Sequence, residues 1–519
     1  MSTDKVREQT TVVATEKIES SSTAESQQSI EDYDAQRLRD LGYKQEFTRE
    51  ISLFVQSGFA FSTMAVLPNW LVNFGSSMAA GGPMSLFWGI IVVAPFVFCI
   101  ALSMSEVFSS YPVNGGVYSW CYLLSSKERG PLMSWICGYT FVAGLLATCM
   151  TVAYSMGEYI LSIANVLRET PVTNQGAYVG LYILLIILGV IYCSLGLRLS
   201  AWLNKFMIYW VTIGTIIVVI AVPVMAQTHP DANWVFTKFE NQTGYSNDGL
   251  AFLLGLLQAG WSFIGFENGA QIAEGTKNAD RTGPRGILIA VSSAVFQAIV
   301  LCISTLFSIQ DVQEIQASSM PVATLFLRAT RNPSLTAFFL VILAVIQFGS
   351  LCNSMVACAQ TLWAMARDEC VPAHHIWYKL HSKSQMPVRI LTLQGIICII
   401  IIMPSFGSEV YWSAIMSTAV ICVNVAYGLP FLCRLLWKRK EMEKGPFNLG
   451  RYSVPINFIA VAWIAFFSVI LCIPSVHPVT AVTMNWSCLM IGFVMLFSLG
   501  FWYIKGRHDY QGPIQTIKG

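Results

Sequence analysis

The stretch AGWSFIGFENGAQIAEG, residues 259–275, ends a long apolar run and carries a carboxylate, Glu267, near its middle. The run begins near residue 249 and has the length of a helix that crosses a bilayer, about 20 residues. An ionised side chain inside such a span costs a few kcal/mol on insertion scales, so it is usually paired, protonated or functional. Glu267 therefore marks a candidate site for binding or for proton coupling.

Glycines recur through the same span, at positions 255, 260, 265, 269 and 275. Each costs roughly 1 kcal/mol of helix stability relative to Ala, so the run favours a helix that opens here. Opened backbone is tolerated at membrane depth only where it lines a cavity. Tight packing of helices on small residues is the alternative for the glycines, but it does not account for Glu267.

Aromatic side chains flank the carboxylate, at Trp261, Phe263 and Phe266. Aromatic faces attract a desolvated cation, and with Glu267 they would form a site for an amine. Ordinary packing is the alternative for each of them. Glu267 has a structural alternative too, as an N-terminal cap of the inner half-helix, and the two roles are compatible.

Similar apolar windows fill the chain after residue 50 and define the fold class. Of its 519 residues 55% are hydrophobic and 12% are charged, against roughly 25% charged in a soluble domain. Because backbone polar groups in lipid must be satisfied within each span, spans of this length are helical, and we expect an all-α polytopic membrane protein. The transmembrane domain is expected at 51–504. A largely disordered tail precedes it at 1–50, and a short tail follows at 505–519. About twelve spans are expected, at 51–75, 84–106, 132–163, 178–196, 203–226, 249–273, 286–308, 334–364, 388–404, 409–433, 455–474 and 484–504.

The positive charges set the expected orientation. With an even number of spans both termini lie on one side, and nearly all of the 31 Lys and Arg residues fall on that side. The exceptions are Arg168, Lys238, Arg328 and Arg331. Both termini are therefore expected to be cytoplasmic. The loop at 227–248 then faces the opposite side, and its sequon at Asn241 predicts a glycan.

Motifs for other chemistry are absent from the sequence. The 14 cysteines include no CxxC pair and no His-Cys cluster at metal spacing. Neither a phosphate-binding glycine loop nor a nucleophile with its base stands out. We expect no metal, no cofactor, no catalytic residues and no nucleic-acid partner. A bundle of spans without an attached soluble domain instead suggests a secondary transporter.

The first span is interrupted in a similar way to the sixth. It contains Gly58, the hydroxyl pair Ser62 and Thr63, and Pro68, which cannot donate a helical hydrogen bond. Broken helices in corresponding positions of two halves are the best sequence indication of a transporter's binding site. Spans one and six are offset as expected if two five-span repeats are inverted, with spans eleven and twelve added.

Three motifs carry a resemblance to a known family. SEVFSSYPVNGGVYSW (105–120) resembles the E-x-x-x-x-YP-x-x-GG-x-Y-x-W signature of the amino acid-polyamine-organocation transporters. GWSFIGFENGAQIAEGTKNADRTGPRGI (260–287) is similar to their sixth span, and QTLWAMARDECVP (360–372) to the end of their eighth. Over about 40–510 the chain most resembles fungal amino acid/choline transporters, of which KGPFNLGRYSVPIN (444–457) is typical.

The resemblance implies a leucine-transporter-like fold, with five plus five inverted repeats and two further helices, and alternating access. It implies that substrate lies between spans one, three, six, eight and ten, and that Glu267 takes part in proton coupling. It implies a cytoplasmic gate that includes Glu106, Tyr111, Gly115 and Gly116. The substrate-binding residues that it implies are Ser62, Thr63, Tyr139, Trp261, Phe266, Glu267, Asn353 and Trp412.

One departure from the family bears on the substrate. Amino-acid permeases of this superfamily usually carry glycines in span one that bind the substrate carboxylate through bare N–H groups, and here the stretch is Phe61-Ser62-Thr63-Met64. This favours recognition through an amine or quaternary ammonium, although the hydroxyls of Ser62 and Thr63 leave GABA open. Lys205, at the start of span five, is either a coupling residue or a positive anchor.

The sequence therefore predicts a secondary active transporter that imports a small nitrogen-containing solute, such as choline, thiamine, GABA or another amino acid or amine. Proton symport and the plasma membrane are expected for this fungal-type family. The tail at 1–50, with Lys5 and Lys17, is expected to meet ubiquitination and trafficking machinery. A nutrient sensor with the same fold is the alternative, and an integral membrane enzyme would need a catalytic cluster that the sequence lacks.

Overall fold

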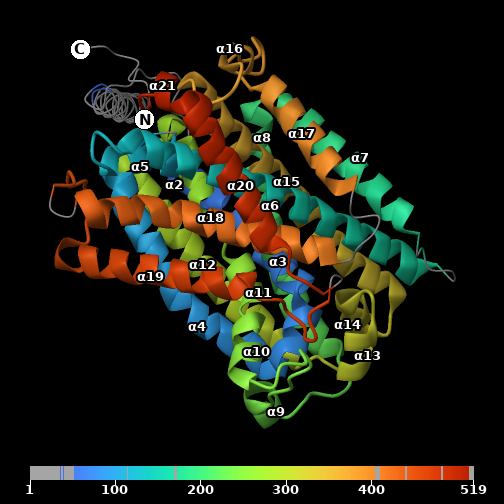
Figure 1. Ribbon diagram of the computed structural model, residues 1–519. Helices are drawn as coiled ribbons and strands as arrows, with labels where there is room; N and C mark the ends of the chain where they lie inside the picture. The colour runs from blue at the N-terminus through green and yellow to red at the C-terminus, as the bar shows by residue number, and fades with distance from the viewer. Residues whose placement is uncertain are drawn as a thin grey trace, which may run out of the picture.

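A computed structural model describes residues 52–113, 115–168, 172, 174–403, 410–438, 441–480 and 483–513, together with Gln36 and Arg39. Across these residues the regular structure is helical (Figure 1). The predictions made for the tail at 1–50, including Lys5 and Lys17, lie outside the described residues. So does the last part of the tail at 505–519.

The predicted spans are present. Ten helical segments in the described part of the chain are long and apolar enough to cross a membrane, and α17 (Val388–Ile402) is a shorter apolar helix. With α17 and a broken first span, α2 (Leu53–Met64) and α3 (Val66–Val72), they account for the expected twelve. The ten are α4 (Phe74–Ser110), α6 (Gly130–Leu167), α7 (Gln175–Ser194), α8 (Leu197–Met225), the sixth span α10 (Asp248–Gly255), α11 (Leu257–Ser262) and η1 (Phe266–Gly275), α12 (Ala279–Leu306), α15 (Pro333–Arg367), α18 (Val410–Trp437), α19 (Ser453–Cys472) and α20 (Ser487–Phe501).

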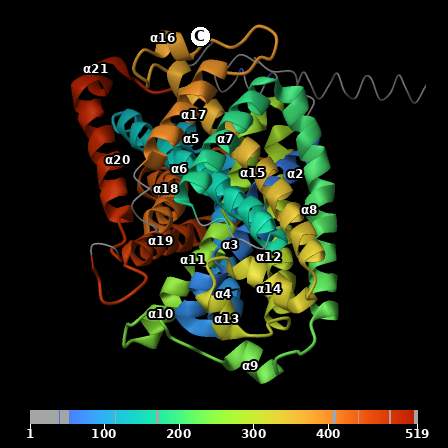
Figure 2. The ribbon, with the colours of Figure 1, turned by 90° about the vertical axis from the view of Figure 1, so that its right-hand side faces the viewer.

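Short helices mark the two ends of the bundle (Figures 1 and 2). One end carries α5 (Gly116–Leu124), α16 (His374–Trp377) and α21 (Arg507–Asp509), and we call it the inner end. The other, which we call the outer end, carries the start of α10 and three helices in loops, α9 (Ala232–Thr237), α13 (Val312–Ala317) and α14 (Pro321–Thr330). The loops expected to be cytoplasmic thus lie at one end. Which compartment each end faces stays a prediction.

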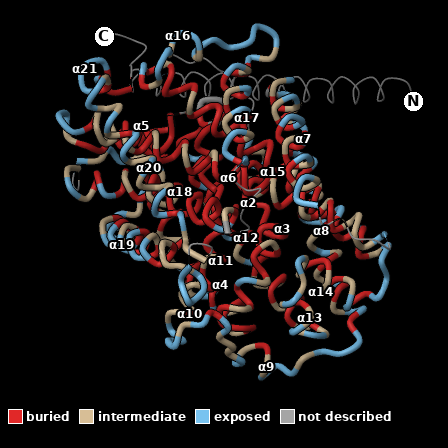
Figure 3. Tube along the Cα trace, turned by 45° about the vertical axis from the view of Figure 1, so that its right-hand side comes forward, coloured by how far each residue is buried: buried red, intermediate tan, exposed pale blue. Residues whose placement is uncertain are grey.

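The centre of the bundle is formed by α6 and α15 (Figure 3). In the most apolar stretch of α6, 78% of the residues are buried inside the protein, whereas in α20 the share is 11%. Large apolar side chains such as Phe493 and Leu496 on α20 remain exposed. Exposed side chains of this kind suit hydrocarbon, so α20 lies at the lipid-facing periphery while α6 and α15 position the interior.

The first span is interrupted at Ala65, which has left-handed backbone angles (φ 41°, ψ 51°) between α2 and α3. Pro68 is the third residue of α3, where its missing N–H needs no partner within the helix. Gly58, which we expected to help open the helix, instead lies inside α2, where a Cβ would meet Ile208. Gly58 therefore allows close packing of α2 on α8.

The sixth span is interrupted between α11 and η1. Gly265, just before η1, has φ 110°, a backbone conformation that L side chains rarely adopt. A Cβ there would lie 2.9 Å from Cγ2 of Thr63, so the two broken spans approach closely at this point. Among the five glycines of this span, Gly265 is the one whose conformation the break requires.

Replacement of Gly265 by Ala is expected to lower stability by about 1–2 kcal/mol or more, because a Cβ is strained in the left-handed region and would press on Thr63. The unfolding temperature in detergent measures the effect. Gly492→Ala is the control, because it lies within α20 where an added Cβ meets no atom within 4 Å. Equal unfolding temperatures for the two variants would show that the break does not need a glycine.

Candidate solute-binding site

The two helix breaks face one another and rest on α15. The backbone carbonyl of Thr63 accepts a hydrogen bond of 2.8 Å from the Ser350 hydroxyl on α15. At the inner side of the break, the Gln56 side-chain amide on α2 donates to the carbonyl of Gly269 at 2.7 Å. These bonds satisfy carbonyls that the interrupted helices leave without their usual donors. The breaks therefore have defined positions within the bundle.

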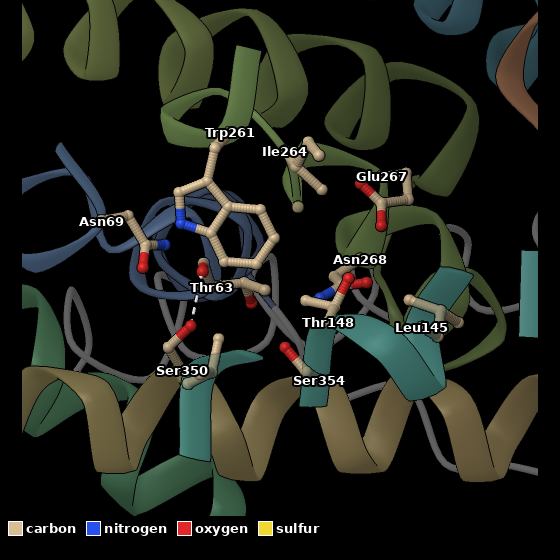
Figure 4. Close-up of a pocket in the computed structure, with 12 residues that line it drawn as sticks. Thr63, Asn69, Leu145, Thr148, Trp261, Ile264, Glu267, Asn268, Ser350 and Ser354 are labelled. Atoms are coloured by element: carbon tan, nitrogen blue, oxygen red, sulfur yellow. Dashed lines mark hydrogen bonds between the residues drawn. The ribbon is translucent and has the colours of Figure 1, made fainter. Parts of the chain in front are cut away.

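A small enclosed cavity lies between the breaks (Figure 4). Its volume of about 10 Å³ is enough for roughly one water molecule. In this conformation the surrounding side chains therefore leave no room for a larger solute. It draws side chains from the first span, α6, the sixth span and α15. The lining residues are Thr63, Asn69, Leu145, Thr148, Val152, Trp261, Ile264, Gly265, Glu267, Asn268, Ser350 and Ser354.

Several polar atoms at this cavity have no hydrogen-bond partner within the described residues. They are both carboxylate oxygens of Glu267, both amide atoms of Asn268, the indole nitrogen of Trp261 and the hydroxyl of Ser354. All four side chains are buried. Leaving one buried polar group unsatisfied typically costs about 1–3 kcal/mol, so this concentration needs an explanation other than stability. Together they offer donors and acceptors to a small polar molecule.

Glu267 occupies the first turn of η1, directly after the break. The backbone N–H groups of Gly265 and of Glu267 itself lie near its carboxylate, an arrangement compatible with the structural alternative, a cap of the inner half-helix. The hydroxyl of Tyr427 on α18 lies near the carboxylate, and the Tyr427 ring contacts Phe266 with centroids 5.4 Å apart. Glu267 thus belongs to a buried polar group shared by η1 and α18.

A buried amide joins the first span to α6 and α15 on the outer side of the cavity. Gln347 on α15 donates to Asn69 Oδ1 at 3.0 Å and to the Ser155 hydroxyl on α6 at 2.6 Å. Asn69 in turn donates to the carbonyl of Met64, next to the first break, at 2.8 Å. This chain of bonds separates the small cavity from a larger one at the outer end.

The structure places Thr63, Trp261 and Glu267, of the predicted substrate residues, on the cavity wall. Phe266 is buried beside Tyr427 and does not line the cavity. Tyr139 lies toward the inner end, where its hydroxyl donates to the carbonyl of Cys370 at 2.8 Å. Trp412 lines the outer cavity. Substrate contact by any of these six residues stays a prediction.

Ser62 and Asn353 meet in a buried network beside the cavity. The Ser62 hydroxyl donates to Asn204 Oδ1 at 2.7 Å, and Asn353 Nδ2 donates to the same oxygen at 2.8 Å and to Ser62 at 2.9 Å. Asn204, on α8, was missed in the sequence, where the neighbouring Lys205 drew attention. Lys205 is exposed, as a positive anchor would be. The network joins the first span to spans five and eight.

The predicted gate residue Glu106 lies in a buried ion pair near the inner end of α4. Its carboxylate accepts from Arg434 on α18 at 2.6 Å, from the Ser453 hydroxyl at 2.5 Å and from the N–H of Leu449 at 3.2 Å. The side chains of Glu106 and Arg434 are 4% and 6% exposed. Charges removed from water to this degree need a partner of opposite charge and further hydrogen bonds. The segment 444–453, part of the family-typical stretch, thereby packs against α4.

The other predicted gate residues form the turn between α4 and α5. The Tyr111 carbonyl accepts a 2.8 Å hydrogen bond from the Trp120 indole, and Gly115 immediately precedes α5. Gly116 has φ 50°, and a Cβ there would lie 3.3 Å from Nε2 of Gln271 in η1. The turn is therefore held closely against the inner part of the sixth span, and its role as a gate stays a prediction.

A second contact at the inner end joins α5 to the end of α15. The Tyr118 hydroxyl donates to the carboxylate of Asp368, just after α15. Burial, and then the charge of Asp368, raises the pKa of Tyr118 well above its usual value. Tyr118 thus keeps its proton at physiological pH and remains a donor.

The predicted glycosylation residue, Asn241, lies in the outer loop. Its Nδ2 donates to the carbonyl of Tyr245 at 2.9 Å and to Asp248 at 3.0 Å, and its Oδ1 accepts from the Thr243 hydroxyl at 2.6 Å. The side chain is therefore engaged in local bonds in this conformation. A glycan on Asn241 stays a prediction.

A helical bundle with two broken spans around a polar cavity defines the class, a polytopic membrane protein with a transporter-like interior. Comparison with known sequences specifies it. The family model described as "Amino acid permease" matches residues 51–495. The chain belongs to this amino acid permease family, as the sequence motifs predicted.

Individual relatives cover nearly the whole chain. A protein named amino-acid permease BAT1 homolog from Oryza sativa subsp. japonica is 32% identical over 93% of this chain and 96% of its own length. Amino-acid permease BAT1 of Arabidopsis thaliana is 28% identical with the same coverage. Amino-acid permease 2 of Neurospora crassa is 29% identical over 92% of this chain and 88% of its own. The similarity therefore extends well beyond the motifs.

Proposed function

We propose that this permease imports an amino acid or a chemically close amine by alternating access, in symport with protons. The observation that carries the proposal is the group of buried, unpartnered polar atoms at the two helix breaks, on Trp261, Glu267, Asn268 and Ser354. A bound polar solute would satisfy them. The names of the relatives, amino-acid permeases of plants and fungi, support an amino acid as the first class to test.

The chemistry of the cavity suits an ammonium group and a second polar group. An ammonium donates to carboxylate oxygens in the strongest class of hydrogen bond, which assigns it to Glu267. The amide of Asn268 and the indole N–H of Trp261 then remain as donors for a carboxylate or hydroxyl of the solute. The site therefore recognises both ends of a small zwitterion, with its amine fixed by a charge.

Neither hydroxyl of the first span is free to replace the missing glycines in this conformation. Thr63 donates its hydroxyl proton to the carbonyl of Phe59 at 2.7 Å, and Ser62 is bonded within the asparagine network. This supports recognition that relies on the amine, which leaves choline and GABA among the candidates beside α-amino acids.

Glu267 is also the proposed proton carrier. No other acidic residue lines the small cavity in the described part of the chain, and the carboxylate lies at the break of a helix that must move if access alternates. Protonation of Glu267 would neutralise the buried charge, and the neutral carboxyl group can still accept a hydrogen bond from the solute's ammonium, so that proton and solute are bound together during the transition to the other side. Coupling by protons fits import at the plasma membrane with both termini cytoplasmic.

Uptake of labelled solutes tests the proposal. Cells that lack their own uptake systems and express this chain would be offered α-amino acids, GABA, choline, thiamine and putrescine, with and without a protonophore. Saturable uptake that the protonophore abolishes is expected for at least one of them. Binding without flux for every solute would favour a sensor, and uptake indifferent to the protonophore would refute proton symport.

A further inference from the structure

A second, larger cavity opens at the outer end. Its volume is about 720 Å³, enough for a solute of amino-acid size, and residues of the outer loops such as Thr243, Met320 and Ser475 form its rim. Its inner wall is formed by the junction of α3 and α4 and by the helices α6, α7 and α18. The Gln347–Asn69–Ser155 chain lies between it and the small central cavity.

Glu158 on α6 gives this cavity its charge. Among the described residues that line the cavity it is the sole Asp, Glu, Lys, Arg or His. It takes part in none of the ion pairs found between described residues. A carboxylate in a concave, mostly uncharged wall focuses its field into the cavity and raises the local concentration of cations.

Aromatic side chains line the same cavity as the carboxylate. Tyr154, one helical turn before Glu158 and within hydrogen-bonding reach of it, stacks on Trp412 of α18 with ring centroids 3.7 Å apart. Tyr178 of α7 lines the same cavity. A carboxylate with nearby aromatic faces is the combination that binds an organic ammonium, since the charge and the ring quadrupoles attract it together.

A polar stripe connects Glu158 to the central cavity. Thr148, Thr151, Ser155 and Glu158 follow one another on α6 at spacings of three or four residues, which places them on one face of the helix. Thr148 lines the central cavity and the other three line the outer one. Ten residues of helix span about 15 Å, so Glu158 lies roughly two solute lengths from the central site.

We propose that Glu158 is an outer binding site for the ammonium group of a cationic solute, such as a basic amino acid or choline, which binds here before it enters the central cavity. The proposal rests on the proposed function for its physiological meaning. It predicts that the site lowers the KM for cationic solutes, while the maximal rate, set at the central site, is independent of Glu158.

Uptake kinetics provide the first test. Glu158→Gln is expected to raise the KM for cationic solutes roughly five-fold, about 1 kcal/mol, with an unchanged maximal rate and an unchanged KM for alanine. Glu158→Asp, which keeps the charge, should recover most of the affinity. Asp231→Asn, which removes an exposed outer carboxylate away from the cavity, should have no effect. A shift in alanine KM, or in the maximal rate at normal surface abundance, would overturn the proposal.

Cysteine modification tests the site without transport, so that failure of the proposed function can be told apart from failure of this site. Ser76 lines the cavity and is exposed. Ser76→Cys should react several-fold faster with a cationic methanethiosulfonate than with an anionic one of similar size, after subtraction of the reaction of the unmodified chain. Adding Glu158→Gln should remove that preference, whereas adding Asp231→Asn should leave it. A ratio that Glu158→Gln does not change would contradict the site even if uptake is robust.

Discussion

Uptake by the Glu267→Gln variant is expected to fall about ten-fold or more, and the remainder to lose its dependence on external pH and on a protonophore. The amide keeps the shape of the side chain but can neither bind an ammonium by charge nor carry a proton. Hydrogen bonds to charged groups contribute about 1.5–3 kcal/mol, and 1.4 kcal/mol corresponds to a factor of ten. Initial rates of labelled uptake at several external pH values measure both effects.

The matched control for this prediction is Glu128→Gln, which removes an exposed carboxylate near the inner end. Both variants should reach the cell surface in normal amounts, since Glu267→Gln keeps the volume of the side chain and removes a buried charge. Uptake by Glu267→Gln at the wild-type rate and with wild-type pH dependence would show that the acid has neither proposed role.

Replacement of Arg434 by Met is expected to lower stability by roughly 3–5 kcal/mol, because it leaves Glu106 buried without its counter-ion. Ser453 and the Leu449 N–H would remain as partners of the carboxylate, but neither carries a charge. Thermal unfolding in detergent measures the loss. Opening of the inner end should also be visible as faster modification of the buried Cys433, which lies next to Arg434.

A double-mutant cycle with Glu106→Gln makes this prediction specific to the ion pair. Because the second substitution removes the uncompensated charge, the double variant should be more stable than Arg434→Met alone, although both changes lie in the interior. Additive losses would show that Glu106 and Arg434 act independently and that the predicted gate does not depend on their pairing.

The helical fold and its two interruptions could be predicted because they depend on local properties. Apolar length and the placement of glycines are readable along the chain, and Gly265 indeed lies at the second break. The first break was located less well. Ala65 carries no sequence signal for a left-handed conformation, whereas Gly58, which does, proved to be a packing position against α8.

Which residues form the site depends more on tertiary structure than the helices and their breaks do, so less of the site could be predicted from the sequence. Asn268 was visible as a polar residue inside a span, beside Glu267, and the argument applied to the acid would have found it. Ser350 and Ser354 of α15 gave no such signal, because serine is common in membrane helices and its role depends on which face meets the cavity. Asn204 pairs with residues 142 and 149 positions away, a relation that periodicity cannot show.

Equilibrium binding to the purified protein tests most directly whether the solute occupies the space between the two broken helices. The solute identified by uptake would be titrated onto wild type, Asn268→Leu and Asn424→Ala, the last a half-buried asparagine of α18 whose amide donates to the carbonyl of Val420 in the same helix. Loss of the Asn268 amide is expected to weaken binding roughly ten-fold or more, with Asn424→Ala unchanged. Wild-type affinity in a folded Asn268→Leu protein would place the solute elsewhere and contradict the account.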